Sequence, residues 1–510
     1  MFACWLALVV IAGYTIDAAG LGVSPWPVLV IATISVAGLA LVGRHIERRA
    51  TGDLLPWIGV CVFVTLALLR VAWPALLPPG RGPDLTHHLL LVDYIEQHGH
   101  LVHDRSLDGS MGEMAHYTPG AHLLAVVAGR WFGVDAIRAF FPLLVLCTAL
   151  TAGFVFLVAR RMPLPVPYAL AAVILLLLPA QYFHGAFTHD SFLAQTVSTF
   201  FAVATWWALT AWDEERSTIG AAIIGLLLVA VFLTWPIWVG PPALVFLALA
   251  LSRRGEGLRY MAVGLGPLLV AASMHVVGRW GWLAIVRTSG AVLRPGLASL
   301  GWLLPSLAIA GVLVGLRDRR ARVTIVLLLL IVLQAVTLFV LATAQGADTP
   351  YMAFKMVYLA IYPAAVLAAV AMANPERAWL ARRREPGESK GALGWIIAAL
   401  LMILVARPAL NAPRVIPVVD LDLYEAGKWT RANVGQTCVD YLVGDAETAY
   451  WLHLAVLGNP RASDRMIEID RYDPRTAAGP WITSESRSHA IADLRLLPDE
   501  VRSRVEVIAQ

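Results

Sequence analysis

Long apolar segments alternate with short polar connections along most of the chain. A transmembrane helix needs about 20 predominantly apolar residues, and this criterion predicts thirteen spans, with an interruption at Trp235-Pro236. They lie near residues 2–20, 24–43, 54–76, 137–158, 166–184, 191–211, 217–235, 237–251, 259–277, 298–316, 323–343, 351–372 and 391–407. The pattern therefore predicts an all-α polytopic membrane protein.

Arginine and lysine residues gather in alternate connections between these spans. The basic connections are 44–49, 160–162, 252–259, 317–322 and 376–390. By the positive-inside rule this side faces the cytoplasm. The outer side then receives the loop 77–136, the connections 184–190, 278–297 and 345–350, and the tail from 408 onward. We predict a multi-pass protein of the cytoplasmic (inner) membrane with an extracytoplasmic C-terminal domain.

The outer loop and the tail have patterns of their own. Residues 84–97 predict an amphipathic helix in the plane of the interface, with Asp93, Glu96 and Gln97 away from its apolar side. Residues 119–132 predict a second, short helix at the surface. The tail predicts helix over 424–433, strand over 438–443, helix over 448–458 and strand over 504–510. We divide the chain into a transmembrane domain, 1–407, and a small α/β domain, 408–510.

Composition supports the membrane assignment. The 510 residues are 59% hydrophobic and 15% charged, whereas soluble domains carry about 25% charged residues. The net charge is +4, and the cations lie mainly in connections between helices, so they indicate topology. We expect the lipid bilayer as a partner and no nucleic acid. Cys4, Cys61, Cys147 and Cys438 form no disulfide or zinc pattern and are interpreted as small buried residues.

Histidines gather in the outer loop, beginning in "PPGRGPDLTHHLLLVDYIEQHGH" (78–100). Seven of the thirteen histidines in the chain lie between residues 87 and 122. Histidine titrates near neutral pH and is the commonest metal ligand. The cluster indicates a functional site, although interfacial loops also tolerate single polar rings. A divalent metal ion on His87, His88 and His189 is one alternative.

The candidate catalytic residues are Asp84, His87, His88, Glu113 and His116. Asp84, His87 and His88 share one helix face by their spacing, and an ionised Asp84 could accept a proton from a bound hydroxyl. A cap on the helix is the structural alternative for Asp84.

Other outer residues are candidates for substrate contacts. Tyr117, His189 and Asp190 are expected to bind substrate, although Asp190 could instead cap the helix that starts at Ser191. Lys355 lies inside a span, four residues past Tyr351, and could bind a lipid phosphate or extend to the interface as an anchor. Arg81, Arg294 and Tyr351 complete the candidate phosphate-binding set.

Two segments resemble a known family. They are "HYTPGAHLLAVVAGRWFGVDAIRAFFPLLVLCTALTAGFVFLVARR" (116–161) and "EAGKWTRAN" (425–433). Together with the early Asp of the first outer loop, they resemble the GT-C integral-membrane glycosyltransferases. The resemblance implies a polyprenyl-phosphate-linked sugar donor, transfer at the outer face to an envelope glycan, lipid or protein, and a base carboxylate at Asp84. The chain lacks the paired acids that many members carry at the end of the first span, and its first long loop follows the third span, which suggests two extra N-terminal helices. These departures leave the subfamily and the sugar open.

A transporter or flippase is the main alternative function. Such proteins place ionisable groups near the bilayer midplane, whereas here the spans 166–184, 191–211, 217–235 and 298–316 contain no Asp, Glu, Lys or Arg, and His184 lies at the end of its span. A non-enzymatic envelope scaffold would leave the histidines unexplained. Another lipid-linked transferase, such as a glycan ligase or a phosphotransferase, remains compatible with the sequence.

Overall fold

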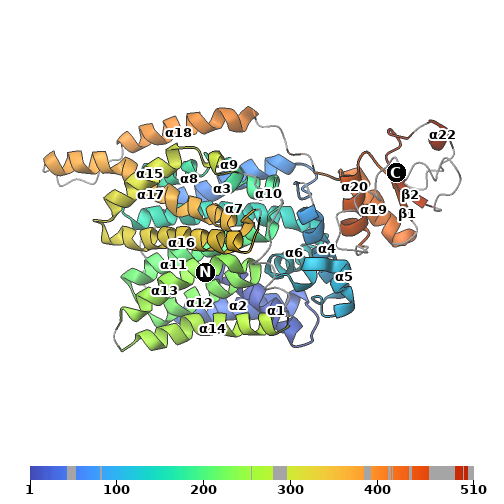
Figure 1. Cartoon of the computed structure of the whole chain (residues 1–510), viewed down its shortest axis with the longest axis horizontal. Helices are drawn as coiled ribbons and strands as arrows, with labels where there is room; N and C mark the ends of the chain where they lie inside the picture. Colours follow the sequence, from blue (N-terminus) through green and yellow to red (C-terminus); the bar gives the residue numbers. More distant parts are fainter. Residues whose placement is uncertain are drawn as a thin grey trace.

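The computed structural model is built almost entirely of helices (Figure 1). It describes residues 1–42, 53–80, 83–253, 255–278, 296–347, 349–383, 392–411, 415, 417–435, 439–458, 489–497 and 499–503. The predicted strand 504–510, Arg81 and Arg294 lie outside the described residues.

Helices occupy the region of every predicted span. They are α1 (Phe2–Ala18), α2 (Pro25–Val42), α3 (Leu54–Leu69), α7 (Ala136–Arg161), α8 (Val166–Leu175), α11 (Leu193–Glu214), α12 (Thr218–Thr234), α13 (Gly240–Leu251), α14 (Gly257–Gly278), α15 (Leu303–Gly315), α16 (Arg322–Ala344), α17 (Tyr351–Arg383) and α18 (Ala392–Asn411). Among the described residues, six helices are long and apolar enough to cross a membrane, and six more are apolar but shorter. The polytopic helical fold is confirmed, whereas the number thirteen stays a prediction.

Shorter elements connect these helices and form the C-terminal region. The connecting helices are η3 (Arg70–Ala72), α4 (Pro83–His98), η4 (Arg105–Leu107), α5 (Asp108–Met111), η5 (Gly112–His116), α6 (Gly120–Phe132), α9 (Ala180–Phe183), α10 (Gly185–Thr188), η6 (Pro236–Val239), η8 (Leu297–Leu300) and η9 (Arg319–Ala321). The C-terminal elements are α19 (Leu421–Asn433), β1 (Val439–Leu442), α20 (Ala446–Trp451), the π-helical turn η10 (Leu452–Val456), β2 (His489–Ala492) and α22 (Asp499–Arg502).

The long helices differ sharply in how deeply they are buried. The most apolar stretches of α7 and α17 are 78% and 72% buried, whereas those of α2, α3 and α16 are only 11–17% buried. Exposed leucine, isoleucine, valine and phenylalanine side chains cover the helices of the second group. Because such a surface would be unfavourable in water, we infer that α7 and α17 form the centre of the bundle and that α2, α3 and α16 face lipid.

The predicted span 166–184 is not one continuous helix. Helix α8 ends at Leu175, and the chain then forms turns and the short helices α9 and α10. The predicted interruption at Trp235-Pro236 is confirmed, since α12 ends at Thr234 and η6 begins at Pro236. Pro lacks an N–H and disfavours a helical residue before it, which accounts for this boundary.

Two predicted surface helices are buried instead. Helix α4 is buried over Leu85–Asp93, and α6 is buried over most of its length against α7, α1 and α4. Asp93, expected on the polar side of a helix at the surface, is buried, and its side chain is 3% exposed. The amphipathic pattern of α4 is real, but a second protein layer covers the polar side.

That second layer is the C-terminal region. Helix α19, α20 and η10 lie beside α4 at one end of the bundle (Figure 1), and η10 packs directly on α4. The predicted strand 438–443 is confirmed as β1, which pairs in parallel with β2. The predicted helix 448–458 is confirmed as α20 and η10, and Gly458 follows them with a φ of +69°.

The opposite end of the bundle collects basic connections. A cavity of about 360 Å³ there is lined by residues of two of them, of the end of α11 and of the start of α16: Arg161, Met162, Thr210, Asp213, Glu214, Asp318, Arg319, Arg320 and Val323. The residues expected on the other side, from the 77–136 loop, the α10–α11 connection and the tail, contact one another at the far end. These connections, predicted on opposite sides, therefore lie at opposite ends of the helix bundle.

Candidate functional site

The candidate site lies where the first turns of α4 meet η5, the start of α11 and the start of α17. Polar side chains of α4, η5 and α17 interact here with one another and with Asp190 of the α10–α11 connection, and α20 of the C-terminal region reaches the same place. Five sequence segments separated by up to 363 residues therefore supply one cluster.

Asp84 is the exposed acid of this cluster, at the start of α4. The protein around its carboxyl group limits hydration, and this desolvation raises the pKa of Asp84 above its usual value of 3.8. The ammonium of Lys355 and the imidazole of His87 act in the opposite direction, whereas Glu113 raises the pKa further. A carboxylate with a raised pKa is a stronger base than an ordinary surface aspartate.

His87 joins the two sides of the site. Its Nδ1 lies 2.7 Å from Oε1 of Glu113, and its Nε2 lies 3.0 Å from the hydroxyl of Tyr450 on α20. The imidazole is only 7% exposed, whereas Glu113 is half-exposed. Glu113 thus links a buried histidine to the surface.

His88 points to the other side of α4. Its Nδ1 lies 2.9 Å from Nε2 of His122, and the ring of Tyr117 packs edge-on against it at 5.1 Å. All three side chains are buried. Desolvation, with a smaller effect from His87, lowers the pKa of His88 to about 3, so the pair is neutral near pH 7. This arrangement suits a structural support better than proton transfer.

Lys355 lies beneath a group of aromatic rings. The side chain is 2% exposed, and its Nζ lies 2.6 Å from the ring centre of Phe192, 4.6 Å from that of Tyr351 and 5.6 Å from that of Tyr358. Such contacts with π faces favour a cation. Lys355 also interacts electrostatically with the carboxylates of Asp84 and Asp190. Residue 84 and the cation of α17 therefore lie in one cluster.

Asp190 is held by two neighbours. It accepts hydrogen bonds from the Tyr358 hydroxyl at 3.1 Å and from Nδ1 of the exposed His189 at 3.0 Å. The alternative that Asp190 caps the next helix is wrong, because α11 begins at Leu193 and Phe192 precedes it. Beside this group lies a cavity of about 10 Å³, lined by Tyr358, Tyr182 and Gln195 among others, which is room for about one water molecule.

Several predicted residues lie apart from this cluster. His116 pairs with Asp108 at 3.5 Å. His100 and His103 lie beside the buried Asp17 of α1, at 3.7 and 2.9 Å. Within the described ranges, no group of three or more His, Cys, Asp or Glu residues is arranged to hold a metal ion, and the candidate ligands His87, His88 and His189 each have other partners.

Sequence reasoning missed Tyr450, Phe192 and Tyr358. Each contacts a candidate residue from a distant segment, so no local spacing indicates it. Tyr358 could have been found, because it follows Lys355 by three residues and therefore shares its helix face.

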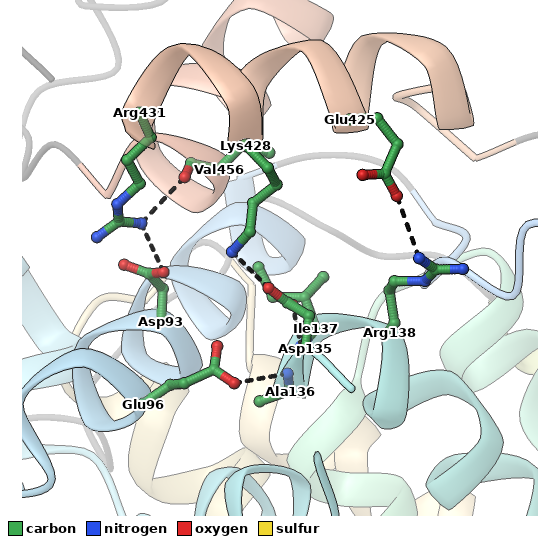
Figure 2. A network of polar contacts seen from close by, with 10 residues as sticks. All are labelled: Asp93, Glu96, Asp135, Ala136, Ile137, Arg138, Glu425, Lys428, Arg431 and Val456. Carbon is green, nitrogen blue, oxygen red and sulfur yellow. Dashed lines mark hydrogen bonds and ion pairs between the residues drawn. The ribbon is translucent and has the colours of Figure 1, made fainter. Parts of the chain in front are cut away.

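The C-terminal region docks on α4 and α7 through a network of charged residues (Figure 2). Arg431 donates to the Asp93 carboxylate at 2.7 Å, Lys428 pairs with Asp135, and Arg138 donates to Glu425 at 3.1 Å. Glu425, Lys428 and Arg431 all belong to the "EAGKWTRAN" segment that carried the family resemblance.

Comparison with known proteins identifies the fold. No protein-family model matches the chain, and no curated protein matches it in sequence. Among solved structures, the apo oligosaccharyltransferase of Archaeoglobus fulgidus matches with a TM-score of 0.51 at 13% identity, over 82% of this chain and 65% of that one. The mycobacterial arabinofuranosyltransferase AftD matches with a TM-score of 0.52 at 14% identity, over 82% of this chain and 33% of that one. ArnT from Cupriavidus metallidurans bound to undecaprenyl phosphate gives 0.49 at 16% identity, over 85% and 91% of the two chains.

The chain therefore has the fold of the GT-C membrane glycosyltransferases, and the resemblance noted in the sequence is confirmed at that level. It spans about two thirds of the oligosaccharyltransferase and one third of AftD. At this identity the likeness establishes the fold and leaves activity, substrates and partners to be proposed.

Proposed function

We propose that this protein is a membrane glycosyltransferase that takes a sugar from a polyprenyl-phosphate-linked donor. The acceptor is an envelope glycan, lipid or protein at the outer face of the cytoplasmic membrane, and residues 408–510 lie outside the membrane. The GT-C fold supports the class of reaction. The observation that carries the proposal is the position of Asp84, an exposed carboxyl group of raised pKa beside the buried Lys355.

The chemistry follows from the donor. A phosphate is a good leaving group, so the site needs a base for the acceptor and positive charge for the phosphate. Asp84 takes the proton of the acceptor hydroxyl while the oxygen of that hydroxyl attacks the anomeric carbon of the donor sugar. The bond from that carbon to the phosphate oxygen breaks, and its electron pair leaves with the polyprenyl phosphate.

Lys355 supplies the positive charge in this scheme. Its ammonium is buried under Phe192 and Tyr351, so a lipid phosphate would contact it directly only after one of these rings turns. In this scheme Tyr351 contributes to binding of the phosphate, and Tyr117, His189 and Asp190 contribute to binding of the substrate. His87 and Glu113 lie around Asp84 and adjust its basicity.

The test is the variant Asp84→Asn, which keeps the shape of the side chain and removes the base. We expect normal expression, unchanged thermal stability and loss of transfer by about 10²-fold or more. Transfer is measured as release of polyprenyl phosphate from a panel of hexose- and pentose-linked donors mixed with envelope extract.

Asp104→Asn is the matched control, since Asp104 is an exposed acid of the same loop that caps η4. It should retain full activity. Wild-type activity in Asp84→Asn removes Asp84 as the base, and a purified wild-type protein that transfers no sugar from any donor of the panel contradicts the proposed class.

A further inference from the structure

The C-terminal region reaches into the candidate site through one side chain, Tyr450. Asp445 caps the start of helix α20 (Ala446–Trp451), since its carboxylate accepts a hydrogen bond from the Thr448 N–H. Tyr450 lies further along this helix with 5% of its surface exposed. Its hydroxyl lies 3.0 Å from Nε2 of His87, and the two rings pack edge-on with their centres 6.2 Å apart.

The partners of His87 fix which nitrogen carries the proton. An ionised Glu113 carboxylate can only accept, so Nδ1 of His87 must donate to it. In the neutral imidazole Nε2 then accepts, and the Tyr450 hydroxyl is its donor. Both nitrogens are satisfied in a single ring orientation. Charged or titratable groups that interact with this ring include Asp84, His88, Glu113 and Tyr450.

The backbone that follows Tyr450 is fastened to the same helix that carries His87. Arg431 donates both to Asp93 on α4 and to the carbonyl of Val456, at 2.7 and 3.0 Å (Figure 2). Gly458 lies against this pair, where a Cβ atom would be 2.5 Å from Oδ2 of Asp93, and its φ of +69° also favours glycine. Helix α4 is therefore clamped at two points: at His87 by Tyr450 and, six residues further on, at Asp93 by Arg431.

We propose that Tyr450 is a positioning residue of the active site, which holds His87 in one tautomer and one orientation beside Asp84. The C-terminal region is then a required part of the catalytic unit, not only a covering domain. This role rests on the proposed function, because it is expressed through the base Asp84.

The first experiment compares Tyr450→Phe with Tyr441→Phe in the full-length protein. Tyr441 makes the same kind of bond, to Nδ1 of His453 at 3.0 Å, within the C-terminal region and away from His87. We expect Tyr450→Phe to lower kcat about tenfold with an unchanged KM for the donor, and Tyr441→Phe to keep both. A wild-type kcat in Tyr450→Phe overturns the proposal. A lower kcat that is explained by a lower thermal stability of this variant also overturns it.

The second experiment does not depend on activity. Diethyl pyrocarbonate modifies an imidazole nitrogen that has a free lone pair, and mass spectrometry locates the modified histidine. His87 should react slowly in the wild-type protein and in Tyr441→Phe, and at least several-fold faster in Tyr450→Phe. Equal rates in all three proteins would show that Tyr450 does not hold His87. If Asp84→Asn proves active but His87 is modified faster in Tyr450→Phe, the function proposed for Asp84 is wrong, whereas the contact between Tyr450 and His87 is confirmed.

Discussion

Asp93 and Arg431, 338 residues apart, form an ion pair of 2.7 Å in which the side chains are 3% and 15% exposed. The pair joins the helix that carries Asp84 and His87 to the C-terminal region. Arg138 and Glu425 form a second ion pair across the same interface at 3.1 Å, but these side chains are 43% and 56% exposed. Figure 2 shows both pairs, so one interface offers a buried bridge and an exposed bridge for comparison.

Breaking the buried bridge should destabilise the protein far more than breaking the exposed one. Arg431→Met leaves the Asp93 carboxylate buried without its partner, which typically costs about 3–5 kcal/mol. Arg138→Met should cost less than about 1 kcal/mol, because exposed pairs contribute little. Thermal unfolding in detergent and limited proteolysis of residues 408–510 measure the two effects.

A further change separates the charge from the packing. Asp93→Asn combined with Arg431→Met removes both charges and should recover part of the lost stability, since no buried carboxylate then lacks a partner. Equal losses in Arg431→Met and Arg138→Met would contradict the burial of the Asp93–Arg431 pair.

The histidine pair His88–His122 predicts an acid-dependent loss of stability. The pKa of His88 is lowered by desolvation to about 3 in the folded protein, whereas an unfolded histidine titrates near 6.5. The unfolded state therefore binds the proton first as the pH falls. Stability from this residue is complete above pH 6.5 and decreases by at most about 1.4 kcal/mol for each pH unit below it, down to about pH 3.

The variant His88→Gln tests this dependence, because an amide can still bond to His122 but does not titrate. Its thermal stability should fall less steeply between pH 7 and pH 5 than that of the wild-type protein. His98→Gln, at an exposed position of the same helix, should keep the wild-type slope. Identical slopes in all three proteins would mean that His88 is hydrated enough to be protonated while folded.

The helical class of the fold could be predicted from the sequence because it depends on local properties. Apolar length alone located the helices, and Trp235-Pro236 marked a real boundary. The i, i+3 and i+4 spacing also placed Asp84 and His87 together, and the structure shows that they interact.

The elements that pack against each helix face could not be predicted in this way. The polar side of α4 looked like a solvated face because nothing near Asp93 in sequence indicates Arg431. Likewise, the spacing that grouped His87 with His88 could not show that they have separate partners, Tyr450 and His122. Periodicity tells which side of a helix is polar, whereas only the fold tells what lies against it.

The surroundings of Asp84 predict how activity responds to pH. Its carboxylate form is the base, so kcat/KM should be constant well above its pKa and fall as the pH decreases through it. Because desolvation raises this pKa, the fall should occur at higher pH than for an ordinary aspartate.

Two neighbours of Asp84 act on its pKa in opposite directions: Glu113 raises it and Lys355 lowers it. Glu113→Gln should therefore move the acidic limb to lower pH, and Lys355→Met should move it to higher pH, each by about one unit. The height of each profile can change for other reasons, including weaker donor binding in Lys355→Met, so the position of the limb is the measurement. Asp104→Asn should leave it in place. Shifts in the same direction for the two variants would show that a group other than Asp84 controls the acidic limb.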